Sequence, residues 1–493
     1  MDSNMVGATG FEPDMAQVKV TFTTTEDGYQ LPETKRQLLV PADIRRLGLS
    51  RILNSESMLG TPQPVPFDFL INGTFLTSTL EDYLQEQGLS FESNITLQYV
   101  RSLVPPKYEA SFEHDDWVSA VDVLSSTSRA GHWSGESFTA GHDRVLSASY
   151  DGLLRIWNGS GDVIATSVAG SHGGHSSSIK AAKFLSSTQV ASAGLDRTVR
   201  VWKYTEGEGH SSSGDLKPTL ELYGHKSSVE SVEVDGASKR VLTASVDGCI
   251  GLWSTSKASA PAAPAELLPG STHASKRRKL AGSASAPQRG ALHLAPFHKA
   301  PATAAIFDPR DRTVAYSAGL DHDLHTIDLT TMTKVSTIPS SSALLSLCAL
   351  PGPSGSPLLA AGTASRNVVL VDPRESQART SVMTLRGHVN KVVSLARCPD
   401  NEHSLVSASH DGTCRVWDLR SVRPATTKED AAGGGVSEAV YVIDRESKGG
   451  KKRPLAGEGC KVFSVVWDQT WGIVSGGEDK RVQINRGRDV ISS

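Results

Sequence analysis

Hydrophobic and polar residues alternate along four similar segments of the chain, each of which ends in tryptophan. The segments are SASYDGLLRIW (147–157), SAGLDRTVRVW (192–202), TASVDGCIGLW (243–253) and SASHDGTCRVW (407–417). Alternation favours a half-buried strand, and an Asp-Gly or similar pair between two such stretches is typical of a tight β-hairpin turn. The first two segments lie 45 residues apart (202 − 157), about the length of one four-stranded propeller blade. The pattern therefore predicts a mainly β fold built as a β-propeller.

Three weaker copies extend the series. They are SAGLDHDLHTIDL (317–329), AGTASRNVVLVD (361–372) and SGGEDKRVQIN (475–485). The first keeps Asp321 and has His298 upstream, the second has Ser365 in the aspartate position, and the third keeps Asp479. Together the copies predict seven blades. Because a ring of sheets exposes strand edges unless its ends pair, we expect the stretch 108–113 to supply the last strand.

Each strong copy brings four polar side chains into one repeating set: an upstream histidine, a serine or threonine, an aspartate and a tryptophan. The sets are His114, Ser147, Asp151 and Trp157; His175, Ser192, Asp196 and Trp202; His225, Thr243, Asp247 and Trp253; and His388, Ser407, Asp411 and Trp417. Serine, histidine and aspartate could form a hydrolase triad, but a catalytic centre occurs once and these sets recur. We therefore expect structural hydrogen-bond quartets, since an unpaired buried polar group costs about 1–3 kcal/mol. The arrangement resembles the WD-repeat family, in which such quartets fasten each blade.

The region before the propeller has a different pattern. We expect strands at 17–24, 37–40, 67–71 and 95–100, helices at 42–54 and 80–87, and a turn at Asn72-Gly73. In the first helix Ile44, Leu47, Leu49 and Ile52 form the expected apolar stripe. The order of strands and helices resembles the ubiquitin-like β-grasp fold.

Two stretches carry a closer resemblance, PVPFDFLINGTFLTSTLEDYL (64–84) and LVPPKYEASFEHDDWVSAV (103–121). They resemble the WD-repeat ribosome biogenesis factors that have a Notchless-type ubiquitin-like N-terminal domain and act with Pescadillo and the block-of-proliferation protein in a trimer. The resemblance implies a non-catalytic assembly factor for maturation of the large (60S) ribosomal subunit and its rRNA processing. It further implies pre-60S particles in the nucleolus and nucleoplasm, and a propeller that binds the propeller of the block-of-proliferation protein.

The resemblance also implies a site in the ubiquitin-like domain. In this family the domain docks on the AAA ATPase midasin, and an acidic side chain in a GLS-x-E context completes the coordination of a divalent metal held by that partner. Here GLSFE places the acid at Glu92, and no cofactor of the chain's own is implied. Mg²⁺ prefers oxygen ligands and is rarely enclosed by one protein, so a carboxylate arriving from a second protein suits it. Glu81, Asp82 and Glu86 are nearby acids, which we assign to the solvent face of a helix.

Composition and charge add a few constraints on function and domain organisation. The 493 residues carry a net charge of −3, so there is no global electrostatic footprint for nucleic acid, and no apolar run reaches membrane-spanning length. The expected divisions are a disordered terminus (1–16), the ubiquitin-like domain (17–101), a linker with the closing strand (102–113) and the propeller (114–493). We expect flexible insertions at about 254–292 and 421–458. The basic run Lys276, Arg277, Arg278 and Lys279 in the first is a candidate nuclear import signal, with loop contact to pre-rRNA or a merely solvated tract as alternatives.

The sequence also bears on two other function classes, enzymes and ubiquitin-ligase components. There is no P-loop and no glycine-rich dinucleotide motif after a strand, so we expect no enzyme. The alternatives are a WD-repeat substrate receptor or scaffold of a ubiquitin ligase, and a Notchless-like factor of the same pathway. Co-purification with cullin subunits would support the ligase, and co-purification with pre-60S particles would support ribosome assembly.

Overall fold

The computed structural model describes residues 16–135, 138, 141–207, 213–268, 286–352, 357–374, 382–423, 435–450 and 459–487. The chain divides into two compact units, which meet in the sequence between Val104 and Pro105. Within the described ranges, every helix is too short or too polar to cross a membrane.

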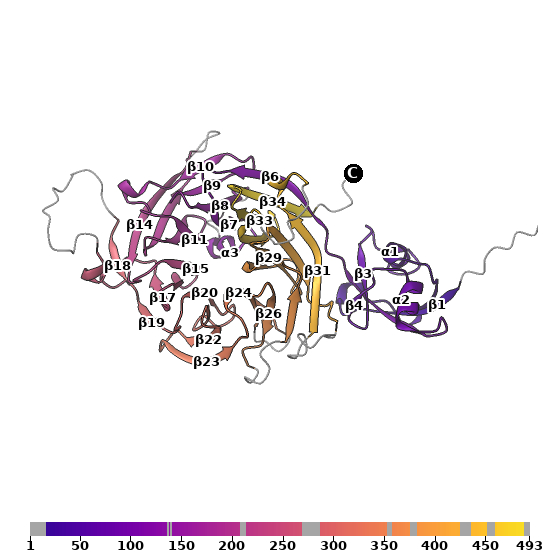
Figure 1. Ribbon diagram of the computed structural model, residues 1–493. Helices are drawn as coiled ribbons and strands as arrows, with labels where there is room; N and C mark the ends of the chain where they lie inside the picture. Colours follow the sequence, from indigo (N-terminus) through magenta and orange to yellow (C-terminus); the bar gives the residue numbers. More distant parts are fainter. Residues whose placement is uncertain are drawn as a thin grey trace, which may run out of the picture. The chain divides into compact units, whose positions relative to one another are not determined.

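The N-terminal unit is a small mixed sheet with two helices (Figure 1). Its elements are β1 (Gln17–Thr23), β2 (Gln37–Pro41), α1 (Arg46–Asn54), β3 (Phe67–Ile71), β4 (Thr74–Phe75), α2 (Leu80–Gln87) and β5 (Ile95–Arg101), with short 3-10 turns at Asp27–Tyr29 and Glu33–Lys35. The strand order is β2-β1-β5-β3-β4. The first and last strands, β1 and β5, run parallel, and the other pairs are antiparallel. The predicted β-grasp fold is confirmed.

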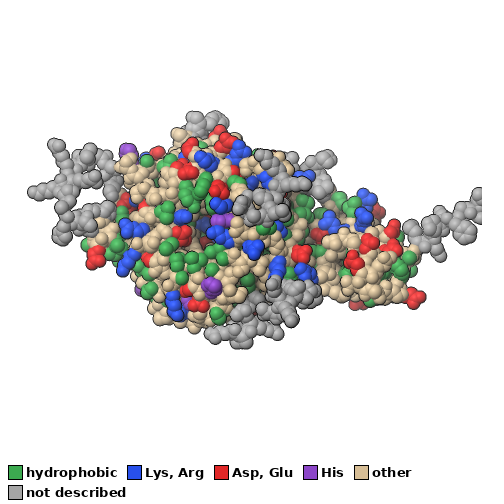
Figure 2. Space-filling view, viewed as in Figure 1, with side chains coloured by type: hydrophobic (Ala, Val, Ile, Leu, Met, Phe, Trp, Pro, Cys, Tyr) green, Lys and Arg blue, Asp and Glu red, His purple; other side chains and the backbone are tan. Residues whose placement is uncertain are grey.

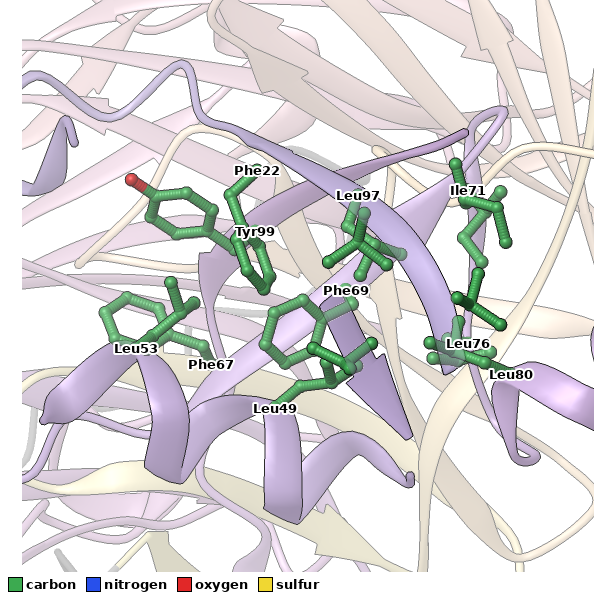
Figure 3. Packing of buried hydrophobic residues seen from close by; sticks show 14 of the residues in the cluster. Phe22, Leu49, Leu53, Phe67, Phe69, Ile71, Leu76, Leu80, Leu97 and Tyr99 are labelled. Atoms are coloured by element: carbon green, nitrogen blue, oxygen red, sulfur yellow. The ribbon is translucent and has the colours of Figure 1, made fainter. Parts of the chain in front are cut away.

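Alternation along the strands builds the core of this unit. Val18, Val20 and Phe22 of β1 are fully buried, while the residues between them face outwards. The Phe22 ring centroid lies 6.3 Å from that of Phe69 and 6.2 Å from that of Tyr99. Figure 3 shows these rings facing Leu49 and Leu53 of α1. Helix α1 and helix α2, which contributes Leu80 and Leu84, therefore complete the hydrophobic core with the sheet.

The first helix differs from its prediction in start and in phase. It begins at Arg46, and Leu47, expected in the apolar stripe, is 63 % exposed. Leu49 and Leu53 are the fully buried pair, because residues four apart share one helix face. Leu47 lies two residues before Leu49 and so points to nearly the opposite side of the helix.

The C-terminal unit is a propeller of seven four-stranded blades within the described residues, which Figure 1 shows arranged in a ring. We number the blades in chain order. From the inner to the outer strand they are β7 (Val118–Leu124), β8 (Arg144–Ser149), β9 (Leu154–Trp157) and β10 (Val163–Thr166); β11 (Ile179–Ser186), β12 (Gln189–Gly194), β13 (Val199–Thr205) and β14 (Asp215–Tyr223); β15 (Val229–Asp235), β16 (Arg240–Ser245), β17 (Cys249–Ser254) and β19 (His293–Pro296); β20 (Ala302–Phe307), β21 (Val314–Gly319), β22 (Asp323–Asp328) and β23 (Thr333–Pro339); β24 (Leu344–Leu350), β25 (Leu358–Thr363), β26 (Val368–Val371) and β27 (Met383–Arg386); β28 (Val392–Arg397), β29 (Ser404–Ser409), β30 (Thr413–Asp418) and β31 (Gly435–Asp444); and β32 (Val462–Asp468), β33 (Gly472–Gly477), β34 (Arg481–Gly487) and β6 (Pro106–Glu113). A short helix, α3 (Arg129–Ser134), follows β7.

The ring closes through both its inner and its outer strands. Each inner strand contacts the inner strand of the next blade, and β32 of the last blade contacts β7 of the first. The fourth strand of the seventh blade is β6, which pairs antiparallel with β34 from Glu113↔Arg481 to Pro106↔Gly487. The inner strands surround a central channel with a volume of about 560 Å³. Because β6 precedes the first blade in the sequence, the first strand of the propeller unit pairs with its last strand, β34.

All seven copies share one backbone feature at the hairpin turn. The residue after the aspartate position has positive φ in every copy: Gly152, Arg197, Gly248, His322, Arg366, Gly412 and Lys480. In three copies this residue is glycine, which adopts such angles without steric penalty. The weaker copies therefore form the same hairpin as the strong ones, and the predicted propeller class is confirmed.

Among their described residues, both expected insertions include regular elements. Between 254 and 292 lie a 3-10 turn at Ala265–Leu267 and β18 (Gln288–Gly290), which pairs parallel with β14. Between 421 and 458 lies β31, the outer strand of the sixth blade. This strand also pairs parallel with β27 of the fifth blade, so the two blades form one eight-stranded sheet.

Candidate functional site

Glu92 lies at the tip of a turn between α2 and β5. Gly88 ends α2 in the left-handed conformation, with φ of 64°. The amide of Ser93 then donates to the carbonyl of Ser90 at 3.0 Å, which places Phe91 and Glu92 at the two corners of the turn. At the end of the loop Asn94 accepts a hydrogen bond from Thr21 of β1 at 3.1 Å. The loop is thus anchored at both ends while its tip projects.

The side chains at this tip face solvent. Glu92 is exposed, and its carboxylate has no hydrogen-bond or ion-pair partner among the described residues. Leu89 and Phe91 beside it are 45 % and 36 % exposed. Large apolar side chains are usually withdrawn from water, so an unpaired carboxylate flanked by two of them forms a small amphipathic surface.

Two of the neighbouring acids, Asp82 and Glu81, accept hydrogen bonds within the helix, unlike Glu92. Asp82 caps the start of α2, where its carboxylate accepts from the Thr79 amide at 3.2 Å. Hydrogen bonds from Thr79 lower the pKa of Asp82 below its usual value. Glu81 accepts from Gln85 at 3.3 Å. Glu86, near the end of the helix, is exposed like Glu92 and serves as its natural comparison.

The structure joins the polar quartet completely in the second, third and sixth blades. In the second blade the Trp202 indole N–H donates to Ser192 Oγ at 2.7 Å, and Ser192 Oγ lies 2.7 Å from His175 Nε2. His175 Nδ1 lies 2.8 Å from Asp196 Oδ2. The corresponding contacts of the third blade join Trp253, Thr243, His225 and Asp247, and those of the sixth join Trp417, Ser407, His388 and Asp411.

The protonation states of the histidine and the aspartate determine which atom donates in each of these hydrogen bonds. Burial lowers the pKa of His175, so the imidazole is neutral at physiological pH. Although burial alone would raise the pKa of Asp196, hydrogen bonds from His175 and Thr198 bring it down to about 2. The carboxylate therefore accepts from His175 Nδ1–H, and Nε2 accepts from the Ser192 hydroxyl. Every polar group has a partner, which suits a structural fastener.

The first blade departs from the expected quartet. Trp157 and His114 both contact Ser147, at 2.7 and 2.8 Å, but Asp151 makes no bond to His114. Its carboxylate instead lies 2.7 Å from Arg155 and accepts from the Leu153 amide at 2.9 Å. A charged partner binds the aspartate more strongly than a neutral imidazole does. Arg200, at the same register of the second blade, pairs with Glu221 at 2.8 Å instead, and Asp196 stays on His175.

The seventh blade has a fastener that sequence reasoning missed. Arg445 replaces the histidine: its guanidinium donates to both Asp479 oxygens at 2.9 and 2.7 Å and to Ser475 Oγ at 2.8 Å. Arg445 follows β31 directly, as His388 follows β27 after one glycine. The 16 residues between Arg445 and β32 (446–461) hid this equivalence, although its partners Ser475 and Asp479 were visible in the sequence.

In the fourth blade, three residues of the quartet are present and the tryptophan is replaced. His298 Nε2 lies 2.9 Å from Ser317 Oγ, and its Nδ1 lies 2.9 Å from Asp321 Oδ1. Ile327 stands where the strong copies have tryptophan and is fully buried. A second histidine, His325, packs beside His298 with ring centroids 4.5 Å apart. Burial lowers the pKa of His325 to about 4.

An aromatic cluster of Trp117, Tyr150 and Phe463 marks one mouth of the channel. The ring centroids lie 5.5 to 6.0 Å apart, and Trp117 is 37 % exposed. Lys180 and Lys461 stand over Tyr150 and Trp117 at 5.1 and 5.9 Å. On the face of the propeller in Figure 2, hydrophobic, basic and acidic side chains are interspersed.

The candidate import run, Lys276, Arg277, Arg278 and Lys279, lies outside the described residues.

Comparison with known proteins places the chain in a family. Residues 18–84 match the NLE (NUC135) domain, and residues 167–203, 216–254 and 379–418 match the WD domain, G-beta repeat. The chain is 70 % identical over 493 residues to the ribosome biogenesis protein YTM1 of Chaetomium globosum, covering 100 % of both chains. It is 71 % identical over 480 residues to ytm1 of Neurospora crassa, covering 96 % of this chain and 98 % of the relative. It is 52 % identical over 483 residues to ytm1 of Aspergillus fumigatus, covering 97 % and 96 %. The chain therefore belongs to the YTM1 family of ribosome biogenesis proteins.

Proposed function

We propose that this protein is a non-catalytic assembly factor of the large ribosomal subunit, whose propeller binds a partner propeller while its ubiquitin-like unit offers Glu92 to a metal held by a midasin-type ATPase. The partner propeller would be that of the block-of-proliferation protein, which also brings Pescadillo. Nucleolus and nucleoplasm are the expected locations. The full-length similarity to ribosome biogenesis proteins supports the pathway.

The exposed carboxylate of Glu92 is the observation that carries the metal-docking role. A carboxylate already bound within its own domain would have to break that bond before it could coordinate a metal. Glu92 has none to break among the described residues, whereas Asp82 is held by its helix cap. Leu89 and Phe91 add apolar surface around the carboxylate, and excluding water from a charged contact strengthens it.

The aromatic cluster and the leucines around it form the surface best suited to a partner propeller. Leu195 and Leu320 are 41 % and 39 % exposed and directly precede Asp196 and Asp321, the register that Tyr150 occupies before Asp151. Blade symmetry therefore puts them on the same end of the propeller as the cluster. Exposed aromatic and apolar side chains are typical of protein–protein interfaces.

Binding of the purified metal-containing domain of the ATPase tests the metal role. We expect Glu92→Ala to weaken binding by about 2 kcal/mol or more, about thirtyfold, because the metal loses a charged ligand. Glu92→Asp should also weaken it, since metal–ligand distances hold to within about 0.2 Å and the shorter side chain withdraws the oxygens. A chelator should abolish wild-type binding.

Glu86→Ala is the matched control, because it removes an equally exposed acid from the same region. It should bind as wild type does. If Glu92→Ala also bound normally, the metal role would be wrong while the propeller role would stand. Affinity purification of both variants, read by mass spectrometry, tests the rest: both should retain the partner propeller and pre-60S proteins. Recovery of cullin subunits instead would favour a ubiquitin ligase.

A further inference from the structure

The fourth blade holds a buried polar group without a partner. His325 is 1 % exposed, and its Nδ1 lies 3.0 Å from the Thr337 hydroxyl. Its Nε2 has no hydrogen-bond partner among the described residues. Buried polar atoms are nearly always paired, so each exception calls for an explanation.

The position of His325 in the blade shows where its side chain points. It stands two residues before Ile327, which corresponds to Gly251 before Trp253 in the third blade. A Cβ added to Gly251 would lie 2.8 Å from Thr243 Oγ1 and 3.0 Å from His225 Nε2. A side chain at this register is therefore aimed at the Ser/Thr–His pair of its own blade. In the fourth blade that pair is Ser317 and His298.

The loss of tryptophan makes room for this imidazole. Ile327 cannot supply the indole N–H that the second, third and sixth blades direct at their serine or threonine. His325 fills part of the space and packs against His298 with the two rings tilted by 33°. The carboxylate of Asp321 completes a group of three whose ligand atoms all lie within 4.8 Å of one another.

We propose that His298, Asp321 and His325 form a binding site for a divalent transition-metal ion, for which zinc is the best match. Two imidazoles and a carboxylate are a ligand set that zinc accepts, with a water or a fourth ligand completing the tetrahedron. Zinc–ligand distances of about 2.0–2.1 Å put ligand atoms about 3.4 Å apart, so the three groups must close by roughly an ångström. The ion would then join the loop before β20 to β22, the connection that tryptophan makes in the strong blades.

The surrounding contacts suit this role. His298 can present Nδ1 to the ion in exchange for its hydrogen bond to Asp321, while Nε2–H stays on Ser317 Oγ. An acceptor that holds the second nitrogen of a metal-bound histidine fixes its ring orientation. The Thr337 hydroxyl does the same for His325 Nδ1. The Asp321 side chain is 9 % exposed, which leaves a route from solvent.

Metal binding by the purified full-length chain tests the proposal. After treatment with a chelator, the protein is titrated with Zn²⁺ and, separately, with Co²⁺, whose visible absorption reports tetrahedral coordination. The informative variant is His325→Arg, because the first, second and sixth blades carry Arg155, Arg200 and Arg415 at this register and the fold accepts it there. His403→Gln, which removes an exposed histidine, is the matched control for adventitious binding.

We expect wild type and His403→Gln to bind one Zn²⁺ that His325→Arg binds at least tenfold more weakly. The tetrahedral Co²⁺ band should be absent from His325→Arg, and Zn²⁺ should raise the unfolding temperature of wild type and of His403→Gln but not that of His325→Arg. The proposal would be overturned if wild type bound Zn²⁺ with no higher stoichiometry or affinity than His325→Arg does. His325 would then be a packing substitute for tryptophan.

Discussion

Arg445 gives the sharpest stability prediction, because it fastens the blade that closes the propeller. Its side chain is 3 % exposed and that of Asp479 is 7 % exposed. Besides Asp479 and Ser475 Oγ, the guanidinium donates to the carbonyls of Ser475 and Arg481 at 3.1 and 2.7 Å. Arg445→Ala removes all of these bonds and leaves the buried Asp479 carboxylate without a cation, with the Ser447 hydroxyl still donating to it at 2.7 Å.

The expected loss follows from that burial. Removing one partner of a buried ion pair costs about 3–5 kcal/mol, because the remaining charge loses its compensation. The pair of Arg486 and Glu109 is the matched control: both belong to the same blade, and their side chains are 37 % and 30 % exposed. Exposed pairs contribute about 0–1 kcal/mol. Arg445→Ala should therefore destabilise the propeller by at least about 2 kcal/mol more than Arg486→Ala does.

Tryptophan fluorescence during denaturant unfolding measures this difference. All eight tryptophans lie after Val104, so the signal reports the propeller and not the N-terminal unit. Trp157 and Trp471 lie in the hydrophobic cluster shared by the first and seventh blades, where a loss of ring closure is sensed directly. The free energy of unfolding is obtained by linear extrapolation for each variant.

A double variant separates the buried charge from the packing. Replacing both members by apolar residues, Arg445→Met with Asp479→Leu, should recover most of the loss, since apolar replacement of a buried pair is often neutral or stabilising. If Arg445→Ala and Arg486→Ala destabilised the propeller equally, to within about 0.5 kcal/mol, the assignment of Arg445 as a fastener would be refuted.

Two further predictions concern pH and the N-terminal core. Burial, followed by the charge of Arg155, lowers the pKa of His114 from 6.5 to about 4. The unfolded chain therefore binds this proton at higher pH than the folded chain, so propeller stability should fall between about pH 7 and 4, by up to about 3 kcal/mol from this residue. Fluorescence-monitored unfolding of His114→Gln should show a smaller fall than wild type; an equal fall would contradict the role. Phe69→Ala should destabilise the N-terminal unit by about 3–5 kcal/mol, because it deletes a fully buried ring. Hydrogen exchange of β3 should reveal this loss while the tryptophan unfolding curve stays unchanged; a shifted curve would show that the two units do not unfold independently.

Local pattern was enough to predict the propeller and the β-grasp unit. Alternation and the turn residues act over a few neighbouring positions, so the hairpins of all seven copies could be recognised even where tryptophan is replaced by Ile327 or Asn485. The second helix, from Leu80 to Gln87, was predicted with its observed bounds, and its capping box is a local feature of the chain. The first helix was predicted to begin at residue 42 instead of Arg46, and Leu47 was predicted to face the core although it is exposed. The apolar residues of this segment fit two helical stripes that are offset by one residue, so the sequence alone does not identify the buried one.

The repeat, its hairpins and the residue types available for fastening each blade thus follow from the linear pattern. Which of those residues bond to one another depends on the folded structure. Asp151 turns to Arg155 instead of His114, Arg445 reaches Asp479 across an insertion, and β31 joins two blades in one sheet. These choices depend on distances between side chains and strands that folding brings together, and on competition among charged partners at those distances, neither of which a linear pattern encodes.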